Sequence, residues 1–242
     1  NRLELIRAEE KKYHDFCYDN YKLFEEGFWL HKPVKTVMNL LHLFNSKDNM
    51  RILDLGSGVG RNSIPMAKEI KNRNGQVVCV DLLDSALEKL MLYSEEYDVE
   101  KVIKPQKADI GHYKIKKNEY DYIVAVSTLE HVESEDVFEN VVRQMAQGTK
   151  WKGINCIIVN SEVEEIDIKT DQKLDVMMEI NMKTEDMKYK LDRIYDGWEV
   201  LDNHVKSLEY KIVRDERDIL LKTNAITYVV KKRIAKDGSV VV

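Results

Sequence analysis

The sequence predicts an α/β protein with a doubly wound, mostly parallel sheet of seven strands, N-terminal helices and an insertion after the fifth strand. Short apolar runs typical of buried strands alternate with longer stretches of helical periodicity between residues 50 and 160. The first run, Arg51–Leu55, passes directly into three glycines within five residues, Gly56–Gly60. Alternation of this kind favours a parallel sheet, whose ligands bind beyond the carboxyl ends of the strands.

Each expected element follows from its local pattern. Helical spacing of apolar residues predicts helices at 3–24, 33–45, 61–72, 84–97 and 134–147, and a further helix from Thr184 to Leu191. Apolar runs predict strands at 51–55, 76–81, 102–107, 121–127 and 154–160.

The length of the chain favours one domain with added elements. A chain of 242 residues that is 43% apolar can bury one sizeable core. We expect residues 1–242 to form a single domain with an N-terminal helical cap at 1–48, a core at 49–160, a lid at 161–195 and C-terminal strands at 196–242. A segment inserted after the fifth strand of such a sheet lies over the ligand crevice, so acceptor specificity is expected in the lid.

The charge of the chain limits the classes of partner. A net charge of −5 argues against broad binding to nucleic acid or to an anionic membrane. No apolar run approaches the length of a membrane span, and the charged N-terminus has no signal-peptide pattern, so a cytoplasmic location is expected. Three cysteines lie far apart, which favours reduced core residues over a disulfide or a metal framework; no metal site is predicted.

The glycine cluster predicts a ligand site. Glycine permits a sharp turn after the strand and close approach of a ligand to the backbone, beside the free N–H groups of the next helix. The spacing is G-x-G-x-G rather than the G-x-G-x-x-G of dinucleotide sites, which argues against an NAD-dependent oxidoreductase. Asp54 beside the loop would repel a pyrophosphate but suits an ammonium group, which favours a cofactor that carries an amino acid.

A second acid ends the next strand. Asp81 follows Val77–Val80 at a position where a carboxylate accepts both hydroxyls of a ribose. Taken alone, Asp81 is more readily explained as a helix cap; together with the glycine loop it frames a crevice of nucleoside size.

These motifs resemble those of class I S-adenosylmethionine-dependent methyltransferases over roughly residues 50 to 160. The resemblance rests on Leu53–Gly60 with Val80-Asp81, on Ala108-Asp109-Ile110 and on Ser127–Val132. It implies a Rossmann-like methyltransferase fold, S-adenosylmethionine as cofactor and S-adenosylhomocysteine as product. The cofactor-binding residues implied are Asp54, Gly56, Ser57, Gly58, Gly60, Arg61, Asn62, Asp81, Leu82, Asp109, Ile110, Ser127 and His131. For Arg61, a surface position is an equal alternative.

The last third of the chain resembles the tellurite-resistance branch of these methyltransferases. The similar segments are Glu179–Met187 and Ile194–Glu199, with Arg61-Asn62-Ser63 after the glycine loop. That branch has a His-Arg pair near the acceptor, where this chain has Glu209 and Tyr210. An oxyanion acceptor that needs basic groups is therefore disfavoured.

Methyl transfer depends mainly on positioning, because the sulfonium methyl is already electrophilic. His131, after the fourth strand, is the best titratable candidate beside the methyl group, although packing against adenosine explains it equally well. The resemblance places Glu209 and Tyr210 on the acceptor side. We expect a methyltransferase for a small-molecule acceptor, acting as a monomer or homodimer without nucleic acid or membrane; the alternative is a cofactor-binding sensor or assembly subunit without transferase activity.

Overall fold

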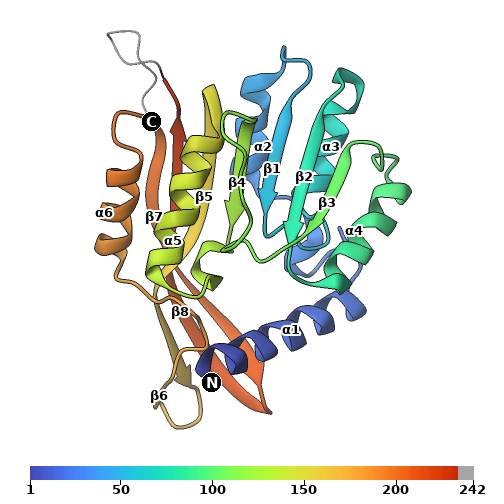
Figure 1. The fold of residues 1–242 in the computed structure, drawn as a ribbon. Helices are drawn as coiled ribbons and strands as arrows, with labels where there is room; N and C mark the ends of the chain where they lie inside the picture. The colour runs from blue at the N-terminus through green and yellow to red at the C-terminus, as the bar shows by residue number, and fades with distance from the viewer. Residues whose placement is uncertain (234–242) are drawn as a thin grey trace.

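The computed structural model describes residues 1–233 and confirms the α/β fold class (Figure 1). Its sheet has the strand order β3-β2-β1-β4-β5-β8-β7, and a two-residue strand, β6, pairs with β5 off this path. The first five strands are parallel, whereas β8 is antiparallel to both of its neighbours. The strands are β1 Arg51–Leu55, β2 Gln76–Asp81, β3 Ile103–Lys107, β4 Tyr120–Val126, β5 Thr149–Asp167, β6 Lys173–Leu174, β7 Glu199–Arg214 and β8 Arg217–Lys231.

The helices occupy the predicted positions, although their bounds differ by up to several residues. They are α1 Arg2–Asn20, α2 Lys35–Leu41, α3 Ser63–Ile70, α4 Asp84–Glu96, α5 Glu135–Gly148 and α6 Thr184–Ile194. α1 ends four residues before the predicted position because Tyr21 has an extended backbone conformation. α2 and α3 each pass into a short 3-10 turn, at His42–Phe44 and Lys71–Arg73, so the predicted helices at 33–45 and 61–72 are each divided in two.

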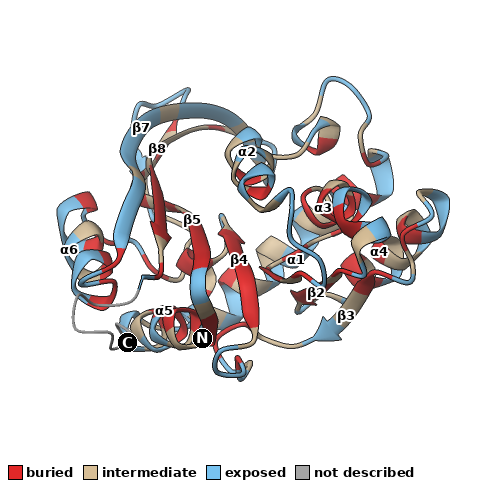
Figure 2. Cartoon of the chain, turned by 90° about the horizontal axis from the view of Figure 1, so that it is seen from above, coloured by how far each residue is buried: buried red, intermediate tan, exposed pale blue. Residues whose placement is uncertain are grey.

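Apolar side chains on both faces of the sheet form two cores. Leu53 and Leu55 of β1 pack into the core shared with α5 and α6, whereas Ile52 packs into the core shared with α2, α3 and α4. Figure 2 shows the helices on the two sides of the sheet. Burial on both faces explains the continuous apolar runs of these strands, because side chains on either face of the sheet are covered by helices and excluded from water.

The C-terminal part departs most from the sequence prediction. β5 extends to Asp167 rather than residue 160, and its outer half pairs with the long β7–β8 hairpin. The predicted lid, 161–195, is therefore divided between the end of β5, β6, a connecting segment and α6, which packs against α5 and β5. Residues 234–242 of the predicted C-terminal strands lie outside the described residues.

α1 runs along the edge of the sheet at which β1, β2 and β4 end (Figure 1). Asn1 caps its first turn by accepting a hydrogen bond from the N–H of Leu3 at 3.0 Å. Ile6, Cys17 and Tyr18 are its buried residues. None of the helices in residues 1–233 has the length and apolar character needed to cross a bilayer.

Candidate functional site at the carboxyl edge of the sheet

The glycine loop after β1 has a backbone conformation that favours glycine. Gly56, Gly58 and Gly60 all have positive φ angles, of 70°, 54° and 102°. The N–H groups of Gly56 and Ser57 both donate to the carbonyl of Val80, at 2.8 and 3.0 Å, which fixes the loop against β2. A Cβ on Gly56 would lie 2.6 Å from the Cβ of Thr128, so only glycine fits there.

Ser57 lies inside this loop with an unused hydroxyl. Its Oγ is buried and has no hydrogen-bond partner among the described residues. A buried hydroxyl without a partner is costly, so this atom is suited to a ligand that fills the loop.

Asp54 lies beneath the loop rather than beside open space. Its side chain is 2% exposed, and its Oδ2 accepts a hydrogen bond from the hydroxyl of Ser63 at 2.5 Å. Burial raises the pKa of Asp54 to about 7, against the opposing effect of the Ser63 bond. The structure therefore gives Asp54 a contact with the start of α3; its predicted contact with an ammonium group stays a prediction.

Asp81 connects the glycine loop to the loop after β2. Its Oδ2 accepts from the N–H of Gly58 and its Oδ1 from the N–H of Leu83, each at 2.9 Å. A carboxylate has about four acceptor positions, so both oxygens retain capacity for the ribose hydroxyls expected from the sequence. Burial also raises the pKa of Asp81.

A cavity of about 450 Å³ opens next to Asp81, between α1 and the loop after β2. Its lining is Arg7, Ala8, Lys11, Leu82, Leu83, Asp84 and Ser85. Leu82, which the sequence predicted at the cofactor, is 44% exposed and contributes an apolar wall. Such a cavity suits the flat, partly apolar half of a nucleoside.

Arg61 and Asn62 hold the N-terminal segment onto the loop. The Arg61 Nε donates to the carbonyl of Lys32 at 2.8 Å, and the Asn62 Oδ1 accepts from the N–H of Val34 at 2.9 Å. The guanidinium of Arg61 also lies 5.8 Å from the ring centre of Trp29. These contacts position the loop, and direct contact of either side chain with a cofactor stays a prediction.

Asp109, at the end of β3, pairs with the N-terminal helix. Its Oδ2 accepts from the guanidinium of Arg7 at 2.9 Å, and its Oδ1 accepts from the N–H of Gly111 at 2.8 Å. Ile110 beside it is buried in the core shared with α5. Asp109 is thus at the predicted edge, with Arg7 as a partner that the sequence did not indicate.

One face of α1 points at these strand ends. Arg7, Glu10, His14 and Tyr18 follow the spacing of one helical face. The hydroxyl of Tyr18 lies 3.0 Å from the position that a Cβ on Gly58 would take, so this side chain covers the glycine loop. His14, whose Nδ1 is buried without a described partner, has its pKa lowered by burial.

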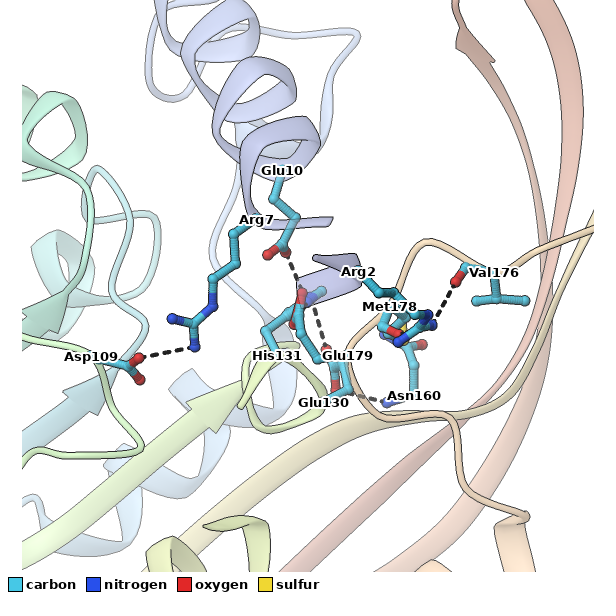
Figure 3. A network of polar contacts seen from close by, with 10 residues as sticks. All are labelled: Arg2, Arg7, Glu10, Asp109, Glu130, His131, Asn160, Val176, Met178 and Glu179. Carbon is cyan, nitrogen blue, oxygen red and sulfur yellow. Dashed lines mark hydrogen bonds and ion pairs between the residues drawn. The ribbon is translucent and has the colours of Figure 1, made fainter. Parts of the chain in front are cut away.

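His131 is enclosed by carboxylates (Figure 3). Its Nδ1 lies 2.8 Å from Oε1 of Glu10 and 3.0 Å from Oε2 of Glu179. Its Nε2 lies 3.7 Å from Oε1 of Glu130, a fully buried residue whose Oε2 accepts from the N–H of Asn160. The cluster thus joins α1, the turn after β4 and the segment before α6.

These carboxylates control the charge of the imidazole. Burial lowers the pKa of His131, but the bonds with Glu10 and Glu179 outweigh it and hold this pKa well above its ordinary value. Burial raises the pKa of both Glu130 and Glu179, whereas the bond with His131 outweighs burial and lowers that of Glu10. A raised pKa favours the imidazolium, in which both ring nitrogens carry a proton and neither can accept another, and this argues against His131 as a general base.

Ser127 ends β4 in the left-handed region, with a φ of 50°, and its N–H donates to the carbonyl of Ile158 at 2.7 Å. Glu209 and Tyr210 lie far along the chain on β7, with 61% and 51% exposure. Glu209 pairs with Lys222 at 3.6 Å. Partial burial lowers the pKa of Arg61, and Tyr210 has a smaller, opposite effect on it. Their predicted place beside an acceptor stays a prediction.

Sequence reasoning missed the contributions of α1 and of Glu130 and Glu179. The polar positions of α1 recur at helical spacing, which is the signal that could have revealed a face directed at the sheet. Glu130 lies within the Ser127–Val132 motif, but its burial could not be read from the sequence.

Residues 52–153 match the family model described as a methyltransferase domain. The matched segment runs from β1 into β5 and includes the glycine loop, Asp81 and His131. No curated protein sequence matches the chain.

Solved structures share the fold of this chain. TehB from Haemophilus influenzae superposes with a TM-score of 0.62 at 17% identity, over 90% of this chain and 66% of TehB. An S-adenosylmethionine-dependent methyltransferase from Clostridium acetobutylicum gives 0.57 at 17% identity, over 81% of this chain and 89% of the other. Phosphoethanolamine N-methyltransferase 2 from Haemonchus contortus was solved with phosphomonomethylethanolamine and S-adenosylhomocysteine. It gives a TM-score of 0.58 at 14% identity, over 87% of this chain and 55% of the other. The chain thus spans just under two thirds of TehB.

Proposed function

We propose that the protein is a methyltransferase that binds S-adenosylmethionine along the carboxyl edge of the sheet and methylates a small-molecule acceptor. The observation that carries the proposal is the arrangement of the glycine loop, the Asp81 carboxylate and the adjacent cavity beneath α1. When bound, the cofactor supplies an electrophilic methyl group to an acceptor atom held in line behind it.

The residues present fit such a cofactor. Ser57 offers a buried hydroxyl without a partner, and the glycines leave room at the backbone that a Cβ would fill. Asp81 retains acceptor positions for ribose hydroxyls, and Leu82 with Ala8 would enclose an apolar base. The main work of these side chains is to bind and orient, since a near-attack geometry supplies much of the rate of a methyl transfer.

The acceptor belongs to the same proposal. The side of the crevice nearest β4 is formed by Glu10, His131 and Glu179, so it is acidic rather than basic. This composition supports a neutral or cationic small molecule over an oxyanion, as expected from the missing His-Arg pair. Monomeric or homodimeric assembly and a cytoplasmic location also stay predictions.

Calorimetry with S-adenosylmethionine, S-adenosylhomocysteine and NAD tests the cofactor. We expect binding of the two adenosyl ligands and none of NAD. Asp81→Ala should weaken binding by about 1.5–3 kcal/mol, the value of hydrogen bonds to a charged group. Asp98→Ala, which removes an 83% exposed carboxylate paired with Lys71, is the matched control and should leave affinity unchanged.

Two results would contradict the proposal. Equal affinity for the wild type and for Asp81→Ala would show that Asp81 does not hold the ribose. Tight binding without turnover of thiols, amines or hydroxyl compounds would favour a cofactor-binding protein without transferase activity.

A further inference from the structure

The cluster around His131 brings more carboxyl groups together than one imidazole can pair. Three carboxylates, from Glu10, Glu130 and Glu179, surround one imidazole. The side chains of Glu130 and Glu179 have no exposed surface. Buried carboxylates need compensating positive charge or hydrogen-bond donors, and even an imidazolium supplies only one unit of charge.

A single proton on Nδ1 satisfies this geometry poorly. One N–H bond points in one direction, yet Nδ1 lies 2.8 Å from Glu10 and 3.0 Å from Glu179. The ligand atoms of Glu10, His131 and Glu179 all lie within 4.8 Å of one another. In an octahedral shell, two ligands at right angles, each about 2.1 Å from the ion, are separated by about 3.0 Å. The two N···O separations therefore match adjacent corners of a metal coordination shell.

Unused buried oxygens point to the same conclusion. Oε1 of Glu179 and Oε1 of Glu130 are buried and have no hydrogen-bond partner among the described residues. The Glu179 oxygen is available as a second donor to an ion at Nδ1. The Glu130 oxygen lies on the opposite side of the ring, 3.7 Å from Nε2. A histidine that binds metal through one nitrogen generally directs its other N–H at a carboxylate, which fixes the tautomer.

We propose that Nδ1 of His131, Oε1 of Glu10 and the carboxylate of Glu179 hold a divalent first-row transition-metal cation such as Mn²⁺ or Zn²⁺, which displaces the Nδ1 proton into solvent. Mixed imidazole and carboxylate donors suit these ions better than the oxygen-only shell preferred by Ca²⁺. Glu130 is a positioning residue that orients the imidazole. The site joins α1 and the segment before α6 to the turn after β4, and its ligands are distinct from the residues proposed to hold the cofactor.

Electron paramagnetic resonance of Mn²⁺ added to the metal-stripped full chain tests the site directly. We expect loss of the free-ion signal at one equivalent, competition by Zn²⁺, and a nitrogen modulation in the pulsed spectrum from the coordinated imidazole. Absence of Mn²⁺ and Zn²⁺ binding at millimolar concentration, or binding without nitrogen modulation, would overturn the proposal. Both readouts use the unmodified protein, so they do not depend on whether a variant folds.

Variants then locate the ion. Glu179→Gln and Glu10→Gln should each weaken Mn²⁺ binding at least tenfold, and Glu130→Gln, which leaves all ligands in place, by about 10–100-fold. The matched control is Glu133→Gln, because Glu133 pairs with His112 at 3.6 Å as a single carboxylate beside an imidazole. Weakening by Glu133→Gln equal to that by Glu179→Gln would place the ion elsewhere. Calorimetry with S-adenosylhomocysteine on the same samples separates failure of this proposal from failure of the proposed cofactor.

Discussion

Replacing Asp54 with asparagine should make the protein less sensitive to pH between 5 and 8. Asp54 is 2% exposed beneath the glycine loop, and burial raises its pKa from 3.8 to about 7. The folded state therefore holds a proton that the unfolded chain has already released over this range. Because the folded state binds more protons, the free energy of unfolding falls as the pH rises.

The size of the effect follows from the two pKa values. Below pH 3.8 the carboxyl is neutral in both states and costs nothing, and above about pH 7 the destabilisation reaches its plateau. A difference of one pKa unit corresponds to about 1.4 kcal/mol, so the full destabilisation is about 4 kcal/mol. Most of it, about 3 kcal/mol, develops between pH 5 and pH 8.

Urea unfolding of the wild type and Asp54→Asn at pH 5 and pH 8 measures this difference. Other titrating groups are common to both proteins and cancel in the comparison. We expect the variant to gain about 3 kcal/mol relative to the wild type on going from pH 5 to pH 8. An exposed carboxylate, tested with Asp98→Asn, should show no such gain. A stability difference that is the same at both pH values would refute the argument from burial.

The remaining predictions concern the loop, the hairpin and α1. Gly56→Ala should destabilise the fold by about 1–3 kcal/mol and weaken cofactor binding, because residue 56 has a positive φ and a Cβ there would collide with Thr128. An unfolding midpoint at the same denaturant concentration as the wild type would contradict this. Arg214→Ala should lower the free energy of unfolding in urea by about 3 kcal/mol. The substitution removes the guanidinium that donates to Glu165 at 2.8 and 2.9 Å and leaves this carboxylate, which is 2% exposed, without its charged partner. A decrease below about 1 kcal/mol, on the order of a surface pair, would show that the pair is not buried in solution. Arg7→Ala should lower the free energy of unfolding by less than about 1 kcal/mol, because the pair of Arg7 with Asp109 is partly exposed. It should nevertheless speed the release of S-adenosylhomocysteine in stopped-flow measurements. An unchanged release rate would show that α1 does not contribute to the cofactor site.

The central strands could be predicted because both of their faces are buried. β1, β2 and β4 then have nearly continuous apolar runs, as expected for strands covered on both faces. The outer half of β5 was missed for a physical reason. Glu165 and Asp167 point inward there and pair with Arg214 and Arg217 of the hairpin, so the segment has the composition of a charged insertion. Partners some fifty residues away cannot be identified from the local pattern.

The strand-end residues of the candidate site could be predicted for a similar reason. Parallel strands place their carboxyl ends at one edge, so Gly58, Asp81 and Asp109 had to lie near one another whatever the loops did. The Glu10 and Glu179 contacts with His131 depend instead on how α1 and the segment before α6 dock. A polar helical face is ordinarily solvated, and only tertiary structure shows that this one is directed at the sheet.

The docking of α1 also connects the two proposed sites. Arg7 and Glu10 lie one helical turn apart, with Arg7 at Asp109 beside the cavity and Glu10 at the His131 cluster. If α1 moves as a rigid body, breaking the contact of Arg7 with Asp109 also displaces Glu10 from His131. The position of α1 beside the cavity therefore determines the distance from Glu10 to His131. Two ligands that favour the same position of one element must strengthen each other's binding by the same factor. A cation at His131 and a cofactor beside Asp81 are therefore expected to bind with positive, reciprocal cooperativity, transmitted through the first ten residues of the chain.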